Sequence, residues 1–475
     1  MSKDLENYTN TLEKYFSNKN LFYFVRDPER ALGLEKILPN YHIIHVLNSQ
    51  YKKYFESIGL NYLCLEDSNQ NSQETNTRKI FNSKEFHSYY EKYLGLPNFA
   101  QTFKTNPAYE KILPKFNLQS LNSGAGVSRV IEDKLSQFQL LSKVVKFPDT
   151  IVVKLSETNY LELTRDFGDS FIIQFQRGHT GSGTFIVYSE AEYRQLIEKR
   201  GNYTVKISKM IKGHSYTINA VSTKKGIYIA GLNYQITGEK QLGAKQGTTV
   251  GNDWSFRNNI NATKEIFKNV KAIGERIYKE GFRGLFGVDF VIDSTGKIFV
   301  IEVNARQTAS IPLFNKIQII NEEIPLSMIH LLEFLNFELP DKIDDYNLRN
   351  NEAMKYSQVF IRDSKEIVVK NTVNMGYYRL QGDNAGMNRV TDEVSKTTIF
   401  IDEDRDKSLL YQGYAATIDA VSQQYILILP PANNRQINPG DEVLRLQLKQ
   451  RSVDENGTVY PWIIETLNSI KNHIQ

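Results

Sequence analysis

Three oxygen-bearing side chains, Asp289, Glu302 and Asn304, have the types and spacing of a metal site. They belong to two segments rich in Val, Ile and Phe, 287–293 and 298–304, which a Ser-Thr-Gly-Lys turn joins into an expected antiparallel hairpin. Strand side chains alternate between the two faces, so Asn304 shares the face of Glu302. The pattern therefore predicts that these oxygen atoms gather on one side of the hairpin.

The expected register decides whether the two carboxylates meet. If Asp293 pairs with Ile298 beside the turn, Asp289 lies directly opposite Glu302. Facing carboxylates repel across a hairpin unless a cation lies between them. Two carboxylates and an amide oxygen suit Mg²⁺, which prefers a few carboxylates together with phosphate oxygens. The alternative is an ordinary hairpin with a solvated polar face. The apolar residues between the acids disfavour it, because buried carboxylates need partners.

A second chemical pattern is the stretch 177–183, Arg-Gly-His-Thr-Gly-Ser-Gly, between expected strands at 171–176 and 184–188. Glycine lets the backbone approach phosphate closely, and successive N–H groups can surround phosphate oxygens. The hydroxyls of Thr180 and Ser182 add further donors. The stretch is not a P-loop, because no Gly-Lys-Ser/Thr sequence follows it. The alternative is a plain flexible hairpin loop.

The elements around these motifs indicate a multidomain protein of mixed α/β and α+β architecture. Residues 20–66 alternate short apolar strands with helical patterns, including a helix expected at 29–38, and this rhythm indicates a small parallel sheet. Residues 128–145 predict one helix, and 263–280 predict an amphipathic helix. Residues 356–475 are β-rich and end in a short helix.

Composition excludes several classes of function. The chain has 475 residues, of which 40% are hydrophobic and 24% charged, with a net charge of +4, as in ordinary globular proteins. No long basic run supports binding to nucleic acid or to a membrane surface, and no apolar run reaches membrane-spanning length. The single cysteine, Cys64, cannot form an intramolecular disulfide. The polar start does not have the pattern of a signal peptide, so we expect a cytoplasmic protein.

The glycine stretch and the hairpin, in this order, resemble the ATP-grasp family. The motif match runs over roughly residues 119–335, and its Glu-x-Asn-x-Arg end is specific. The resemblance implies a Rossmann-like α/β domain over 1–118, an ATP-grasp nucleotide-binding core over 119–340 and a β-rich domain over 341–475.

The resemblance also implies roles for individual residues. Lys134, in an Asp-Lys pair, would contact phosphate, and Lys134 and Arg306 would provide the positive charge for catalysis. Asp289, Glu302 and Asn304 would bind Mg²⁺, with Mn²⁺ as an alternative ion. The residues expected to bind ATP are Lys134, Gln174, Arg177, Gly178, His179, Thr180, Gly181, Ser182, Gly183, Ser208, Lys209 and Ile211.

Two departures from the family pattern weaken the expected nucleotide contacts. The family usually has a lysine where Gln174 stands, so a charge-assisted contact with phosphate is missing. Arg177 or His179 could replace that lysine. The acid that faces the ribose or adenine appears as Ser208, and the glutamate of a nearby Gly-x-Glu turn appears as Ser215.

The chemistry implied by the resemblance is the ligation of a carboxylate to an amine. ATP would phosphorylate the carboxylate, and an amine or similar nucleophile would displace phosphate, so the partners would be small-molecule acids and amines. Lys240, Lys245 and Asp253 in the polar stretch 234–254 could hold them, unless this stretch is a solvated loop. Two alternatives are an ATP-dependent phosphotransferase and a degenerate nucleotide-binding or scaffold protein. A homo-oligomer is compatible with each of them.

Overall fold

The computed structural model describes residues 2–68, 77–176, 183–257, 260–370, 373–381, 398–400 and 408–475. In these ranges the strands form sheets of five, eleven, two and four strands. No helix of the described ranges is long and apolar enough to cross a membrane.

The N-terminal region is a parallel α/β sheet, as predicted. Its strands are β1 (Asn20–Val25), β2 (Tyr41–His45), β3 (Asn61–Cys64), β4 (Asn98–Thr102) and β5 (Leu118–Ser120), and its helices are α1 (Lys3–Phe16), α2 (Lys52–Ser57), α3 (Leu65–Ser68), α4 (Lys84–Tyr90) and α5 (Pro107–Ile112). The strand order is β3-β2-β1-β4-β5. Every residue of β1, β2 and β4 is buried, as expected of parallel strands that are covered on both faces.

The helix expected at 29–38 is wrong, because only a short 3-10 turn forms, at Pro28–Ala31. Gly33 ends the helical pattern with a φ of +127°, a conformation that side chains other than glycine rarely adopt. A Cβ atom at this position would lie 2.8 Å from the Cβ of Asn315, in helix α11 (Ile311–Ile320). The chain therefore turns at Gly33 to pack closely against α11.

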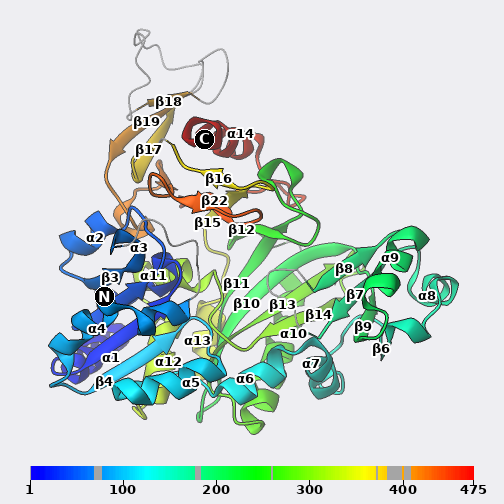
Figure 1. Ribbon diagram of the computed structural model, residues 1–475, viewed down its shortest axis with the longest axis horizontal. Coiled ribbons are helices and arrows are strands. Elements are labelled where there is room, and N and C mark those ends of the chain that lie inside the picture. Colours follow the sequence, from blue (N-terminus) through cyan, green and yellow to red (C-terminus); the bar gives the residue numbers. More distant parts are fainter. Residues whose placement is uncertain are drawn as a thin grey trace.

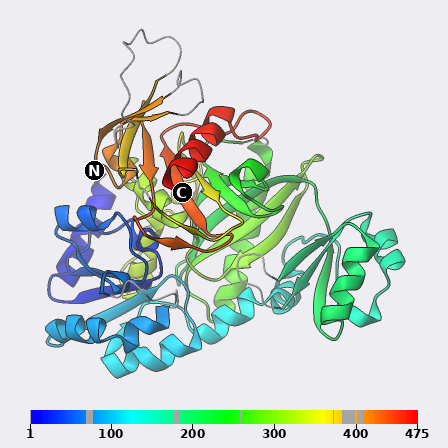
Figure 2. The ribbon, with the colours of Figure 1, turned by 45° about the horizontal axis from the view of Figure 1, so that its top comes forward.

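A small antiparallel lobe follows, in the strand order β6-β9-β7-β8. It consists of β6 (Thr150–Lys154), β7 (Phe171–Phe175), β8 (Thr184–Val187), β9 (Thr204–Lys209), α8 (Tyr160–Phe167) and α9 (Glu190–Arg200). Ser189 caps α9 by accepting a hydrogen bond from the Glu192 N–H, and serine is favoured at this position because it satisfies an N–H group without a partner inside the helix. Figures 1 and 2 show this lobe on the far side of the molecule from the N-terminal sheet.

The largest sheet is antiparallel, in the strand order β14-β13-β10-β11-β12-β15-β22-β20-β17-β19-β18. Its strands are β10 (Gly213–Ser222), β11 (Ile227–Thr237), β12 (Thr249–Asp253), β13 (Gly284–Asp293), β14 (Ile298–Asn304), β15 (Ser357–Arg362), β17 (Gly376–Gln381), β18 (Thr398–Phe400), β19 (Ser408–Gly413), β20 (Ile426–Leu429) and β22 (Glu442–Leu448). The two-stranded sheet pairs β16 (Ile367–Val368) with β21 (Gln436–Ile437). The largest sheet runs through the expected domain boundary at residue 340, so the division into domains stays a prediction.

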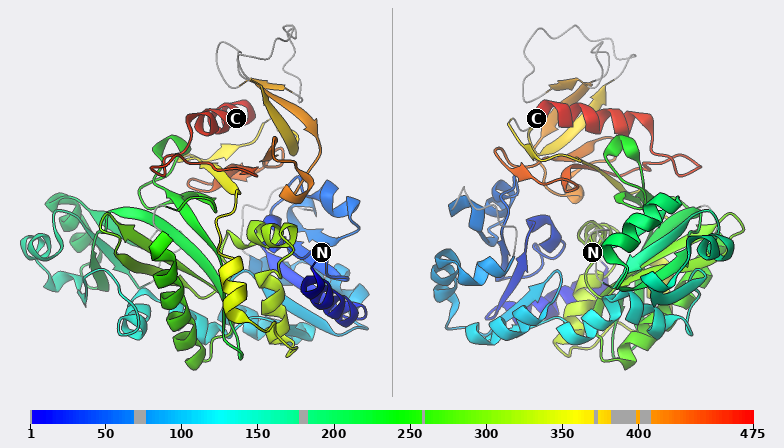
Figure 3. Two further views of the ribbon diagram at one scale, coloured as in Figure 1. Left: turned by 180° about the vertical axis from the view of Figure 1, so that it is seen from behind. Right: turned by 45° about the vertical axis from the view of Figure 1, so that its right-hand side comes forward.

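Helices cover this sheet. They are α10 (Ile260–Lys279), α11, α12 (Leu326–Phe334), α13 (Ile343–Arg349) and α14 (Pro461–Ile474). The prediction of an amphipathic helix at 263–280 is confirmed, because the apolar face of α10 is buried, at Ile266, Val270, Ile273 and Ile277. Helix α10 packs on β10 and β11, and α14 packs on β15 and β22 in the C-terminal region (Figure 3).

Asp253 joins the large sheet to the C-terminal region. It is fully buried, and its Oδ1 accepts hydrogen bonds from the N–H groups of Ser255 and Phe256. Its Oδ2 accepts hydrogen bonds from the N–H and the hydroxyl of Ser452, at 2.7 and 3.0 Å. These contacts occupy both oxygens of the carboxylate. Asp253 is therefore neither available to bind a substrate nor part of a solvated loop, and both expectations for it are wrong. Lys240 and Lys245, in contrast, are exposed.

Candidate functional site

The hairpin of β13 and β14 places Asp289 opposite Glu302, as predicted. The register beside the turn is different, because Ile292 and not Asp293 pairs with Ile298. An irregularity next to Asp289 then shifts the pairing by one residue and brings the two carboxylates back into opposition. A β-bulge re-aims strand side chains in this way and is frequent beside functional sites.

Asp289 has amide donors on both of its oxygens. Gln235 Nε2 donates to Oδ1 at 3.1 Å, and Asn304 Nδ2 donates to Oδ2 at 3.2 Å. Burial, followed by the negative charge of Glu302, raises the pKa of Asp289 to about 6. Gln235 lies on β11, which β10 separates from β13. Sequence reasoning missed Gln235, because only the strand order brings it to the hairpin.

Glu302 is paired with the lysine that the sequence places in the site. Lys134 Nζ lies 3.2 Å from Glu302 Oε1, and the Lys134 side chain is 9% exposed. Burial acts to raise the pKa of Glu302, but Lys134, followed by Arg306, lowers it below its usual value. The two facing carboxylates therefore differ, since Glu302 stays ionised beside its cations while Asp289 holds a proton more readily.

Lys134 is positioned by a break between two helices. The single helix expected at 128–145 is wrong, because α6 (Ala125–Glu132) ends and α7 (Lys134–Leu141) begins at Asp133. Asp133 is extended, and its Oδ1 accepts hydrogen bonds from the N–H groups of the second and third residues of α7. Aspartate favours this position because it satisfies N–H groups that have no partner inside the helix. Lys134 thus starts α7, and its N–H donates to Gln176 O after β7, at 3.4 Å.

Arg306 completes the group of charged side chains. Its Nη2 donates to Asn304 Oδ1 at 2.8 Å, and its Nε lies 3.0 Å from Glu132 Oε1. The second Glu132 oxygen lies 2.5 Å from Lys104 Nζ. Glu132 ends α6, so the same helix break orients both Lys134 and Arg306. Sequence reasoning did not single out Glu132, although it directly precedes the Asp-Lys pair.

The nucleotide-binding residues expected in the small lobe are only partly described. Gln174 is buried on β7, and its Nε2 donates to Thr184 Oγ1 at 3.2 Å. Ser208 is buried and Lys209 exposed at the end of β9, Ile211 is half-buried, and Gly183 O accepts from the Phe175 N–H. The expected residues that lie outside the described ranges are Arg177, Gly178, His179, Thr180, Gly181 and Ser182.

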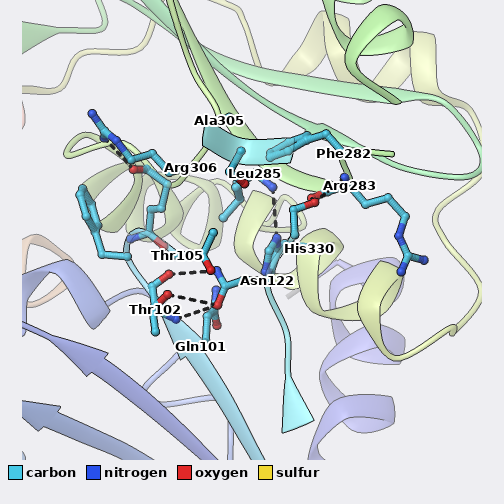
Figure 4. Close-up of a pocket in the computed structure, with 14 residues that line it drawn as sticks. Gln101, Thr102, Thr105, Asn122, Phe282, Arg283, Leu285, Ala305, Arg306 and His330 are labelled. Atoms are coloured by element: carbon cyan, nitrogen blue, oxygen red, sulfur yellow. Dashed lines mark hydrogen bonds between the residues drawn. The ribbon is translucent and has the colours of Figure 1, made fainter. Parts of the chain in front are cut away.

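A cavity of about 20 Å³ lies beside Arg306, where the N-terminal region meets the large sheet (Figure 4). This volume holds about one water molecule. Figure 4 shows His330 on its wall, where its Nδ1 accepts from the Leu285 N–H at 3.1 Å. Burial lowers the pKa of His330 to about 4, so this histidine is neutral at pH 7. The cavity is too small for a substrate, and His330 has a structural role.

We expect Asp289→Asn to stabilise the protein without added Mg²⁺, and to do so more strongly at pH 8 than at pH 5. A carboxyl group whose pKa is raised by folding gives its full stability only below its unfolded pKa of 3.8, and that stability is lost progressively as the pH rises to about 6, so pH 5 lies inside this range and pH 8 above it. Asparagine removes a buried negative charge and its repulsion from Glu302, which we expect to be worth roughly 1–3 kcal/mol at pH 8. Denaturant unfolding at both pH values measures the difference. An equal effect at pH 5 and pH 8 would contradict the assigned titration of Asp289.

Comparisons with known proteins find an ATP-grasp domain in the middle of the chain. Residues 131–310 match the ATP-grasp domain model. The arginine-specific large chain of carbamoyl phosphate synthase from Bacillus subtilis is 24% identical over 217 residues, which are 43% of this chain and 19% of that protein. D-alanine–D-alanine ligase from Thermotoga petrophila is 23% identical over 245 residues, which are 50% of this chain and 78% of that protein. The chain thus spans only a fifth of the first relative.

A solved structure extends the likeness over most of the chain. It is the biotin carboxylase domain dimer of the Hydrogenobacter thermophilus 2-oxoglutarate carboxylase, in complex with MgADP, ADP and bicarbonate. The TM-score is 0.55 at 10% identity, over 91% of this chain and 86% of that chain. At this identity the likeness shows the fold alone, and it confirms the expected mixed α/β and α+β architecture. Residues 131–310 of the chain therefore carry an ATP-grasp domain.

Proposed function

We propose that this protein is an ATP-dependent ligase, which activates a substrate carboxylate as an acylphosphate and joins it to an amine or a similar nucleophile. The observation that carries the proposal is the opposition of Asp289 and Glu302 beside two cationic side chains, Lys134 and Arg306. Such a site can hold a metal ion and a highly charged phosphate chain together.

The residues present fit Mg²⁺, or alternatively Mn²⁺. Asp289, Glu302 and the Oδ1 of Asn304 would hold the ion. The described part of the chain has no group of three or more His, Cys, Asp or Glu side chains that could bind a metal. Phosphate oxygens would therefore complete the coordination, as is usual for Mg²⁺ bound with a nucleotide. When bound, the ion would neutralise negative charge on these oxygens.

The proposed reaction has two steps, and no protein nucleophile takes part in it. A carboxylate oxygen attacks the γ-phosphorus of ATP, and the bond to the leaving ADP breaks. The amine then attacks the acyl carbon, loses a proton and expels phosphate. Lys134 and Arg306 place fixed positive charge where negative charge develops on the transferring group.

Acceptor-dependent formation of ADP and phosphate tests the proposal. A panel of carboxylates and amines is incubated with Mg-ATP, and ADP, phosphate and the joined product are measured. A carboxylate labelled with ¹⁸O should pass one labelled oxygen to phosphate, because the acylphosphate contains that oxygen. A phosphotransferase would yield a phosphorylated acceptor without free phosphate. A degenerate protein would bind nucleotide without acceptor-dependent turnover.

The remaining features of the proposal rest on composition and family likeness. We place the nucleotide-binding core at 119–340, between an α/β domain at 1–118 and a β-rich domain at 341–475. The single cysteine and the absence of long basic runs support a cytoplasmic enzyme with small-molecule substrates and no nucleic-acid partner. A homo-oligomer is compatible with this proposal.

A further inference from the structure

Lys206 carries a buried ammonium group that the proposed reaction does not yet use. It lies on β9 and is 4% exposed. Within the described ranges its Nζ takes part in no hydrogen bond or ion pair, and it lies 5.6 Å from the centre of the Phe147 ring. Contact with an aromatic ring offsets only part of the cost of taking an ammonium group out of water. Among the described residues the group therefore has no anion in direct contact.

The side chain points away from the hydrophobic core of the small lobe. Its neighbours along the strand, Val205 and Ile207, belong to that core. Strand side chains alternate, so Lys206 projects from the opposite face. It pairs there with Gln174 of β7, and directly paired side chains lie on the same face of a sheet.

That face of the lobe is turned toward the charged site. The start of α7 is hydrogen-bonded to the end of β7, and α7 packs on β7 and β9. The charges of Lys134 and Glu302 both act on Lys206, and burial together with Lys134 lowers its pKa to about 8. The ammonium groups of Lys134 and Lys206 thus lie near the single carboxylate of Glu302, and Lys134 is the one with a direct contact to it. The excess positive charge favours an anion with several charges.

We propose that Lys206 is a second phosphate-binding lysine, which holds the polyphosphate chain of the nucleotide together with Lys134. The inference rests on the proposed function. Gln174, which stands where the family resemblance leads one to expect a lysine, is the direct cross-strand neighbour of Lys206. Paired residues have Cβ atoms about 5 Å apart, so a lysine on either strand can reach the same phosphate oxygens. Lys206 on β9 would thus supply the positive charge that the family resemblance leads one to expect at position 174 on β7.

Titration calorimetry on Lys206→Met tests this assignment with three probes: a non-hydrolysable ATP analogue with Mg²⁺, ADP with Mg²⁺, and adenosine. We expect affinity for the two phosphorylated probes to fall roughly 10- to 100-fold, the usual worth of a charged hydrogen bond, while adenosine binds as before. The melting temperature should not fall, because a buried charge is replaced by an apolar chain. Lys199→Met, at an exposed position of α9 in the same lobe, should bind all three probes as the wild type does.

A second substitution separates a phosphate contact from a structural role. Gln174→Lys in the Lys206→Met protein should restore most of the lost affinity, because it returns a cation to the same face. Equal losses for adenosine and the ATP analogue, or no loss at all, would overturn the inference and leave the proposed ligase function intact. A wild-type protein that binds no nucleotide would overturn both.

Discussion

Glu302→Gln is expected to abolish Mg²⁺-dependent ADP formation while the fold is retained. The change removes one anionic ligand and preserves the shape of the side chain, so the hairpin pairing with Asp289 remains. It also removes the charge that Lys134 contacts at 3.2 Å. Loss of a charged group from a preorganised site costs roughly 10²–10³-fold in rate, and we expect at least the upper value because two contacts fail together.

The assay compares ADP formation with the most active acid and amine pair over a range of Mg²⁺ concentrations. Glu275→Gln, on the exposed side of α10, is the matched control and should turn over as the wild type does. Circular dichroism and the melting temperature establish that the variant is folded. Wild-type turnover by a folded Glu302→Gln protein would show that the metal assignment is wrong.

The hairpin could be predicted from the sequence because its evidence is local. Alternating apolar and acidic residues fix which face each side chain occupies, and the turn fixes the pairing to within one residue. The error at Asp293 arises inside the turn, where its carboxylate accepts hydrogen bonds from the N–H groups of Thr295 and Lys297. The bulge beside Asp289 shifts the register back by one residue, so Asp289 still lies opposite Glu302 as predicted. No feature of the sequence indicated this bulge.

The two helices that were predicted wrongly, at 128–145 and 29–38, fail for different physical reasons. The break at Asp133 carries a capping signal that the sequence does contain, namely an aspartate directly before Lys134. The failed helix at 29–38 depends on Gly33, whose closeness to Asn315 is a contact between segments distant along the chain. Gly33 alone is a weak sign of a break, because an isolated glycine is tolerated in helices.

The side chains that complete the site could not be predicted from the sequence patterns around them, because tertiary packing brings them to the site. Gln235 reaches Asp289 across an intervening strand, and Glu132 meets Arg306 through the packing of α6 on β14. The strand pattern around Lys206 shows that it faces away from the apolar residues on either side of it. Only the tertiary arrangement shows that this face is turned toward Glu302.

Arg306→Lys is expected to slow phosphoryl transfer strongly while nucleotide affinity changes little. The guanidinium donates to Asn304 and to the Gln307 carbonyl and pairs with Glu132 at the same time, and these contacts fix its orientation. Lysine keeps the charge but has a single donor group on a flexible stem, so it cannot maintain these contacts and still reach the transferring group. We expect kcat to fall roughly 10²–10³-fold, as when a preorganised donor is removed.

Single-turnover rates and calorimetry with a non-hydrolysable ATP analogue separate this effect from binding. Arg276→Lys, on α10 in a partly exposed pair with Glu280 directly after that helix, is the matched control and should keep the wild-type rate. Glu132→Gln should give a milder loss of rate than Arg306→Lys, because Asn304 still orients the guanidinium. If Arg306→Lys weakens binding of the analogue and leaves the single-turnover rate unchanged, Arg306 holds the ground-state nucleotide. In that case the charge that stabilises the transferring group comes from Lys134, whose ammonium lies 3.2 Å from Glu302 Oε1.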